Sequence, residues 1–183
     1  MKTSECRLPG VFVVEASPFA DHRGKFQRVF CDQELQDVIG ARSIVQINHS
    51  QTASVGAVRG MHYQRAPHAE MKLIRCLKGR VWDVAVDLRA GSPTFLQWHA
   101  EELSFDNNKM FVIPEGCAHG FQVLEENSEL LYLHTARYTT DAEGGVRYND
   151  PMLQIAWPLP ITDTSRRDES HPLLSATFPG LSV

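Results

Sequence analysis

One stretch, residues 58–64, carries the side chains best suited to acid–base chemistry. It holds Arg59, His62 and Gln64, and Lys72 follows at the start of the next β-like segment. Side chains of a strand alternate between its two faces, so polar groups in this pattern predict a polar pocket inside a barrel. An imidazole has an ordinary pKa of about 6.5 and accepts a proton readily at neutral pH. We therefore predict that His62 is a general base and that Lys72 is its electrophilic neighbour.

Strand alternation also predicts which side chains share a face with this pair. A lysine on a central strand is costly to bury unless it is paired, and Asp83, one hairpin away, is the predicted partner of Lys72. In residues 129–136, Tyr132 and His134 share one face, so His134 is expected to line the same pocket as Tyr132.

The elements that position these residues are predicted to be mostly short strands. Short strands at close spacing, with turn residues between them, indicate an all-β sandwich or barrel and not parallel βαβ units. The predicted strands are residues 11–15, 25–31, 44–48, 71–77, 81–88, 97–104, 109–113, 120–124 and 129–138. One short helix is expected from an N-cap at Asp32 to Gly40. The proline-rich tail from Asn149 is expected to pack on the barrel, which gives one domain over residues 1–183.

Composition narrows the functional class. Apolar residues make up 43% of the 183 positions, charged residues 22%, and the formal net charge is -4, as in ordinary soluble proteins. There is no basic run, which argues against nucleic acid as a partner. Without a leader-like segment or a run of 18 apolar residues, we expect a cytoplasmic protein that neither is exported nor spans a membrane. The four widely spaced cysteines are expected to be reduced thiols.

Two segments resemble the signatures of the cupin superfamily, whose fold is a double-sheet jelly-roll barrel. These are Gly56-x5-His62 and Pro114-x-Gly116-x2-His119. Most cupins bind a metal through a His-x-His pair, a Glu and a further His. Here the pair reads His62-Tyr63-Gln64, and the cationic Lys72 beside it is unfavourable for a divalent ion. The sequence therefore predicts no metal.

Longer blocks resemble one cupin family, the dTDP-4-dehydrorhamnose 3,5-epimerases, from about residue 10 to residue 174. The matching blocks are Asp21-x-Arg23-Gly24-x-Phe26, Gln46-Ile47-Asn48-His49-Ser50, Arg59-Gly60-Met61-His62-Tyr63-Gln64, Lys72-Leu73-Ile74-Arg75-Cys76, Asp83-Val84-Ala85-Val86-Asp87-Leu88-Arg89, Gly91-Ser92-Pro93-Thr94, Ile113-Pro114-Glu115-Gly116-Cys117-Ala118-His119-Gly120-Phe121 and Gly145-Val146-Arg147-Tyr148-Asn149-Asp150-Pro151.

The resemblance implies a cofactor-free epimerase of a nucleoside-diphospho-4-keto-6-deoxyhexose that inverts C3 and C5 through an enolate. His62 would accept the proton, Asp168 would be its dyad partner, Tyr132 would donate a proton and Lys72 would stabilise the enolate. The implied substrate-binding residues are Phe19, Arg23, Arg28, Gln46, Asn48, Arg59, His119, Tyr138, Glu143 and Arg167. Members of the family are homodimers that exchange N-terminal strands between subunits, so Arg23 would reach the diphosphate bound to the neighbouring subunit.

Two departures from the family pattern leave alternatives open. Arg28 stands where the family often has Glu near the nucleobase, and residues 133–137 lack the usual Lys and acidic residue. They suggest a 3-only or 5-only epimerase on a related nucleotide sugar as a second enzyme hypothesis. A metal-dependent cupin oxygenase and a non-catalytic sugar-binding cupin are hypotheses of different classes.

Overall fold

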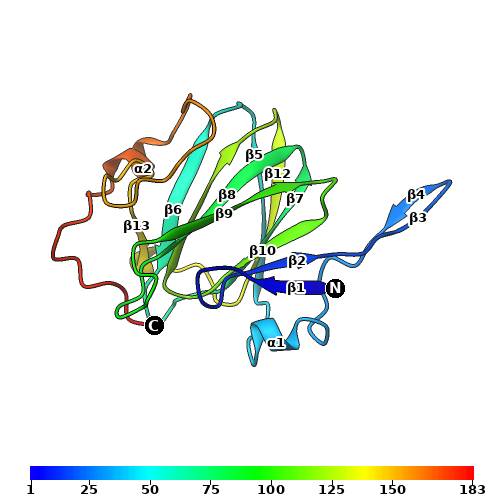
Figure 1. The fold of residues 1–183 in the computed structure, drawn as a ribbon, viewed down its shortest axis with the longest axis horizontal. Coiled ribbons are helices and arrows are strands. Elements are labelled where there is room, and N and C mark those ends of the chain that lie inside the picture. The colour runs from blue at the N-terminus through cyan, green and yellow to red at the C-terminus, as the bar shows by residue number, and fades with distance from the viewer.

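Two antiparallel β-sheets face each other and enclose the core, as Figure 1 shows for the computed structural model, which describes residues 1–183. The first sheet has six strands in the order β1-β2-β10-β7-β12-β5, which span Lys2–Glu5, Phe12–Glu15, Lys109–Ile113, Lys72–Lys78, Ser128–His134 and Gln46–Thr52. The second has five in the order β13-β6-β11-β8-β9, which span Glu143–Gly145, Val58–Gln64, Cys117–Val123, Arg80–Asp87 and Trp98–Ser104. The predicted all-β, cupin-type double-sheet fold is confirmed.

The remaining elements are small. A hairpin of β3 (Phe19–Asp21) and β4 (Gly24–Phe26) projects away from the two sheets (Figure 1). The helical segments are α1 (Gln36–Ile39), the 3-10 turn η1 (Thr140–Ala142) and α2 (Arg166–Ser170). None of them has the length and apolar character that crossing a membrane requires.

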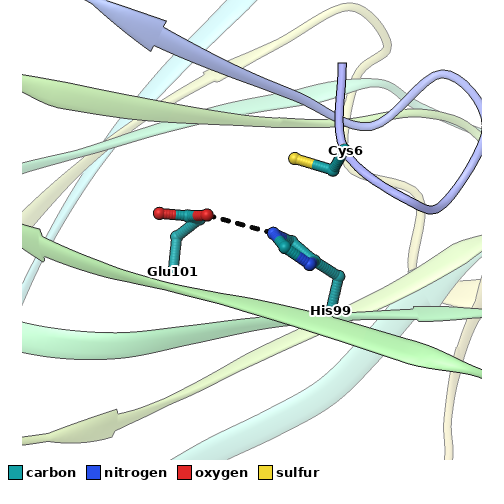
Figure 2. Close-up of side chains that lie close together, drawn as sticks. All are labelled: Cys6, His99 and Glu101. Carbon is teal, nitrogen blue, oxygen red and sulfur yellow. Dashed lines mark hydrogen bonds and ion pairs between the residues drawn. The ribbon is translucent and has the colours of Figure 1, made fainter. Parts of the chain in front are cut away.

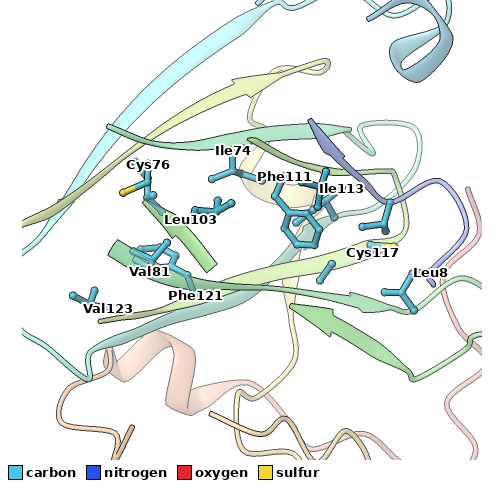
Figure 3. Close-up of a cluster of buried hydrophobic side chains, with 14 of the residues drawn as sticks. Leu8, Ile74, Cys76, Val81, Leu103, Phe111, Ile113, Cys117, Phe121 and Val123 are labelled. Carbon is cyan, nitrogen blue, oxygen red and sulfur yellow. The ribbon is translucent and has the colours of Figure 1, made fainter. Parts of the chain in front are cut away.

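The space between the sheets is filled by alternate side chains of the facing strands (Figure 3). On β7, Ile74 and Cys76 point into this core, whereas Leu73 packs on the outside against the buried residues Val38 and Ile39 of α1. Both faces of β7 are therefore covered, and its polar residue Lys72 is held in a largely buried position.

The C-terminal tail packs on the outer face of the second sheet, as predicted. Trp157 and Phe178 belong to a cluster with Met61, Val84 and Val86. The indole Nε1–H of Trp157 also donates to the Tyr148 carbonyl at 2.9 Å, so the tail is fixed by polar as well as apolar contacts.

Several predicted element bounds were wrong. Strand β1 was missed, because the exposed sequence Lys-Thr-Ser-Glu has no apolar pattern and pairs only as an edge strand. Residues 27–31 form no strand, β11 already begins at Cys117 and β12 ends at His134. The helix begins only at Gln36, because Asp32 accepts from the neighbouring Gln33 N–H in a preceding turn and does not cap it.

A polar cluster joins the loop after β1 to strand β9 (Figure 2). His99 Nε2 lies 3.0 Å from the Glu101 carboxylate, the Lys109 ammonium binds the other oxygen of Glu101 at 2.8 Å, and the free thiol of Cys6 lies beside them. Cys6, His99 and Glu101 offer donor atoms within 4.8 Å of one another. Because the carboxylate already binds an imidazole and an ammonium, this cluster is an ion-pair network.

This network predicts a pH-dependent contribution to stability. The Cys6 sulfur and then the Glu101 carboxylate raise the pKa of His99 to about 9. Because the pKa of His99 is higher in the folded protein than in the unfolded chain, protonation of His99 stabilises the fold. This stabilisation is complete below the unfolded-state pKa of about 6.5 and is lost as the pH rises through about 9. We expect His99→Gln to lower the free energy of unfolding by about 1–2 kcal/mol at pH 6 and by much less at pH 10. Urea unfolding at pH 6 and pH 10 measures these free energies, and substitution of the exposed His22 by Gln is the control. An equal loss of stability in His99→Gln at the two pH values would contradict the assigned role of His99.

Candidate active site

A cavity of about 970 Å³ opens between the two sheets and the C-terminal segment. Ten of the predicted site residues line it: Asn48, Arg59, His62, Lys72, His119, Tyr132, Tyr138, Glu143, Arg167 and Asp168. They come from strands of both sheets, from the segment after β12 and from α2. His62 and Tyr132, on β6 and β12, therefore meet the same cavity from different sheets.

His62 and Asp168 form a hydrogen-bonded pair. Ser165 caps α2 by accepting the Asp168 N–H at 3.0 Å, which turns the Asp168 carboxylate toward β6. One carboxylate oxygen lies 2.7 Å from His62 Nε2, and the other accepts the Gly60 N–H at 3.1 Å. Burial alone would raise the pKa of Asp168, but the hydrogen bonds from His62 and Gly60 outweigh it and lower that pKa. The ionised carboxylate holds the proton of His62 on Nε2, which leaves the Nδ1 lone pair free to accept another.

The Gly60 N–H that binds the Asp168 carboxylate lies where strands β6 and β11 approach each other closely. Gly60 has φ +126°, and a Cβ there would lie 2.5 Å from Gly120 Cα and 2.8 Å from the His119 oxygen. Only glycine fits so close an approach of β6 and β11.

We expect Gly60→Ala to destabilise the protein by about 2 kcal/mol or more and to lower kcat roughly tenfold, because the strained strand also moves the N–H that orients Asp168. Thermal unfolding and steady-state kinetics measure both. Gly91→Ala is the matched control, since Gly91 also has a positive φ of 73° but no atoms within 4 Å of its Cβ position. Equal effects of the two substitutions would contradict the account.

Tyr132 brings a phenol to the cavity from β12. Its hydroxyl lies 3.3 Å from Ser50 Oγ, and its ring meets that of His119 edge to face at 6.0 Å between centroids. Burial raises the pKa of Tyr132, with only partial compensation by the Ser50 hydrogen bond. The phenol is therefore fully protonated at neutral pH.

Lys72 does not pair with Asp83, and that prediction was wrong. Asp83 lies on β8 in the second sheet and is fully buried, with one oxygen 2.6 Å from His119 Nε2. Lys72 lies in the first sheet, where its ammonium is 3.3 Å from a Glu70 oxygen and donates to the His62 carbonyl at 3.3 Å. Strand alternation tells which side chains of one strand share a face, but it does not tell which groups of different strands meet.

Two arginines at the mouth of the cavity differ in whether a carboxylate pairs with them. Arg59 donates to Thr52 Oγ1 at 2.9 Å and to a backbone carbonyl, and no carboxylate pairs with it. Arg167 instead forms an ion pair with Glu143, whose other oxygen accepts the Tyr138 hydroxyl at 2.8 Å. The guanidinium of Arg59 is therefore free to bind an anionic group, since such a fork matches carboxylate or phosphate oxygens.

Four predicted substrate-binding residues do not line the cavity. Phe19 and Arg23 lie on the exposed β3–β4 hairpin, and Arg28, just after it, pairs with Glu34. Gln46 is at the rim, where it binds Asn48 at 3.3 Å and accepts the Tyr138 N–H at 3.1 Å. Phe19 is 80% exposed, and the hairpin contacts the rest of the chain through Lys25, whose ammonium lies 4.1 Å from the centroid of the Phe105 ring and 3.8 Å from an Asp106 oxygen.

Two residues beside the cavity, Glu70 and His171, were missed in the prediction of the site from the sequence. Glu70 was not predicted as a site residue, yet it contacts Lys72 and also His134, which was expected on this wall. His171 was not predicted as a site residue either, and its ring centroid lies 6.1 Å from that of His62, edge to face. His62, Asp168 and His171 have donor atoms within 4.8 Å of one another. An ion there would have to displace the His62–Asp168 hydrogen bond.

Comparison with known proteins places this geometry in a family. The chain matches the family model of the dTDP-4-dehydrorhamnose 3,5-epimerases over residues 5–176. It is 44% identical over 160 residues to such an enzyme from Pseudomonas aeruginosa, covering 87% of both chains, and 41% identical over 169 residues to one from Salmonella typhimurium, covering 91% of this chain and 92% of that protein.

A solved structure gives the same result for the fold. The dTDP-6-deoxy-D-glucose-3,5-epimerase of Legionella pneumophila, crystallised in complex with dTDP-4-keto-L-rhamnose, superposes with a TM-score of 0.91 at 34% identity, covering 100% of this chain and 98% of that chain. Sequence and fold agree over almost the full length. The chain belongs to the dTDP-4-dehydrorhamnose 3,5-epimerase family and is thus an epimerase, a member of the isomerase class.

Proposed function

We propose that this protein inverts C3 and C5 of a dTDP-linked 4-keto-6-deoxyhexose, as a step in the synthesis of dTDP-rhamnose. The observation that carries the proposal is the shared cavity, in which an imidazole oriented by a carboxylate and a protonated phenol project from different sheets. Inverting a carbon requires a base on one face of the sugar ring and an acid on the other. The two side chains supply these groups without a redox step.

Each inversion proceeds through an enolate. The 4-keto group acidifies the hydrogens on C3 and C5, and His62 Nδ1 takes one of them as a proton. The electron pair of the broken C–H bond forms a double bond to C4, and the π pair of the carbonyl moves to the C4 oxygen, where the Lys72 ammonium stabilises the negative charge. Tyr132 then gives its proton to the carbon from the opposite face as the carbonyl re-forms. His62 returns its proton to solvent and Tyr132 takes one from solvent, so nothing is consumed before the second carbon reacts.

The nucleotide end of the substrate needs cations and a ring-stacking surface. Within one chain, Arg59 supplies a guanidinium without a carboxylate partner, and Gln46, Asn48 and Tyr138 supply polar groups at the rim. The projecting hairpin with Arg23 and the exposed Phe19 supports a homodimer with exchanged N-terminal strands. In that dimer, Arg23 would bind the diphosphate in the partner's cavity, with Phe19 and Arg28 beside the base.

Deuterium incorporation tests the reaction. The protein is incubated with dTDP-4-keto-6-deoxyglucose in D2O, and the product is examined by proton NMR. Deuterium at both C3 and C5, together with the inverted product and undiminished turnover after treatment with a chelator, is the expected result. Deuterium at one carbon only would establish a 3-only or 5-only epimerase, and turnover lost with the metal would indicate a metal-dependent cupin.

A further inference from the structure

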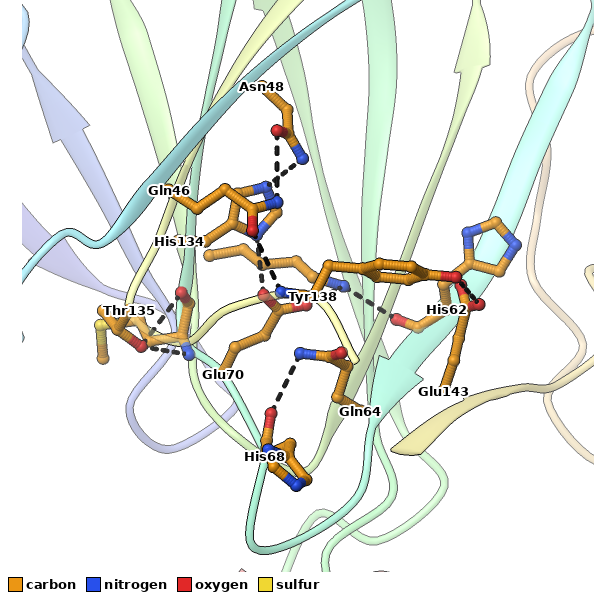
Figure 4. Close-up of polar contacts among 12 residues, drawn as sticks. Gln46, Asn48, His62, Gln64, His68, Glu70, His134, Thr135, Tyr138 and Glu143 are labelled. Carbon is orange, nitrogen blue, oxygen red and sulfur yellow. Dashed lines mark hydrogen bonds and ion pairs between the residues drawn. The ribbon is translucent and has the colours of Figure 1, made fainter. Parts of the chain in front are cut away.

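A chain of hydrogen bonds runs along the wall of the cavity from the segment after β12 to Glu70 (Figure 4), and Glu70 in turn pairs with the Lys72 ammonium. It begins at the backbone N–H of Tyr138, which donates to Gln46 Oε1 at 3.1 Å. Gln46 Nε2 donates to Asn48 Oδ1 at 3.3 Å, and Asn48 Nδ2 lies 3.3 Å from His134 Nε2. His134 Nδ1 lies 2.8 Å from one oxygen of Glu70.

The direction of this chain is fixed at its start. A backbone N–H can only donate, so the oxygen of the Gln46 side chain must face Tyr138 and its NH₂ group must face Asn48. Asn48 must then turn its oxygen to Gln46 and its NH₂ group to His134. His134 Nε2 is therefore an acceptor, and the single ring proton is on Nδ1, where it is donated to Glu70.

Glu70 is the point at which the chain meets the catalytic lysine. Its side chain is 8% exposed, and its second oxygen lies 3.3 Å from Lys72 Nζ. Burial alone would raise the pKa of Glu70, but the hydrogen bond from His134 and the charge of Lys72 outweigh it and lower that pKa. A buried carboxylate thus accepts from both neighbours, and Lys72 also donates to the His62 carbonyl.

His134 is held by packing as well. It pairs directly across the sheet with Lys72, and its ring stacks on that of Tyr132 with 6.0 Å between centroids and 16° between planes. The imidazole of His134 therefore packs against the ring of the proposed acid Tyr132. Through Glu70 it is also linked to the ammonium of the proposed enolate-stabilising residue Lys72. A change in that ring's orientation or proton position would move both groups.

We propose that Glu70 and His134 are positioning residues that fix the Lys72 ammonium beside the enolate oxygen, through a hydrogen-bond chain whose direction is set by the Tyr138 backbone. This inference rests on the proposed function, since it gives Lys72 its role there. It also joins the rim residues Gln46 and Asn48, proposed to bind the nucleotide, to the reacting centre.

The substitution Glu70→Gln tests the proposal, because an amide has only one oxygen acceptor, whereas the carboxylate uses one oxygen for His134 and the other for Lys72. Its NH₂ group must face either the Lys72 ammonium or the Nδ1–H of His134, so one contact fails. We expect kcat to fall about tenfold with KM within threefold of the native value, since the ammonium is misplaced in the transition state. Nitrogen-15 NMR of the native protein should show His134 protonated on Nδ1, and the variant should lose that pattern.

A matched control and a rescue variant separate positioning from folding. Glu129, a half-buried residue that does not line the cavity, also bridges a histidine and a lysine, His49 at 3.1 Å and Lys78 at 3.6 Å, so Glu129→Gln should leave kcat unchanged. His134→Gln can still donate to Glu70 and accept from Asn48 and should keep kcat within threefold, whereas His134→Leu should lose about tenfold.

The outcomes are distinct. Native kcat in Glu70→Gln, a His134 proton on Nε2 in the native protein, or equal kcat losses in both His134 variants would overturn the proposal. If the native protein exchanges no deuterium into the sugar, the proposed function fails. The tautomer of His134 and its response to Glu70→Gln would then still show whether the hydrogen-bond chain exists.

Discussion

His62→Asn should lower kcat for epimerisation by about 10³-fold and abolish deuterium exchange at C3 and C5 alike. The Asp168 carboxylate keeps the hydrogen bond from the Gly60 N–H, and the cap of α2 by Ser165 does not involve His62, so we expect the fold to be retained. What is lost is the free Nδ1 lone pair, the only part of the dyad that can take a proton from carbon. Steady-state kinetics and NMR of the exchange in D2O measure both effects.

His68→Asn is the matched control for this substitution. His68 is exposed on the loop after β6, and its hydrogen bonds come from the backbone: its carbonyl accepts from Gln64 Nε2 at 3.0 Å and its N–H donates to the Arg65 carbonyl at 2.9 Å. It should leave kcat and KM unchanged. Substantial exchange at either carbon in His62→Asn would show that another group is the base at that carbon.

Tyr132→Phe should separate proton removal from inversion. Loss of the phenol removes the proposed acid on the opposite face, and we expect formation of the inverted product to fall by about 10²-fold or more. The proposed base His62 and the proposed enolate stabiliser Lys72 remain, so C3 and C5 should still exchange hydrogen for deuterium with retention of configuration. Product analysis by NMR distinguishes exchange with retention from exchange with inversion.

Tyr148→Phe is the corresponding control, because the Tyr148 hydroxyl makes no hydrogen bond and lies outside the cavity. The hydroxyl of Tyr132 meets only Ser50, so its removal should cost less than about 1.5 kcal/mol of stability. If Tyr132→Phe lost exchange and inversion to the same degree, the phenol would be needed for proton removal and the assignment of roles would be wrong.

The residues on regular strands were the easiest to predict from the sequence. The alternation in residues 129–136 correctly put Tyr132 and His134 on one face, and both line the cavity. The same rule could not pair these groups, because the distance between inward side chains depends on how the two sheets face each other. Asp83 was therefore assigned to Lys72, although it binds His119.

Residues outside strands were harder to predict. Asp168 lies in a polar run that by itself indicates a solvent-exposed segment, and only the family resemblance singled it out. The structure shows it 3% exposed, because the short helix α2 folds back onto Gly60. Glu70 gave no such signal: it precedes β7 in a loop, and its contacts with Lys72 and His134 arise only when β7 and β12 pair.

A crystal structure of this protein with a dTDP-4-keto-sugar or a close analogue in the cavity tests the central claim most directly. The account predicts the sugar ring between His62 and Tyr132, with Nδ1 of His62 on one face, the phenol on the other and the C4 oxygen next to the Lys72 ammonium. A ring bound with both side chains on the same face, or bound away from residue 62, would contradict it.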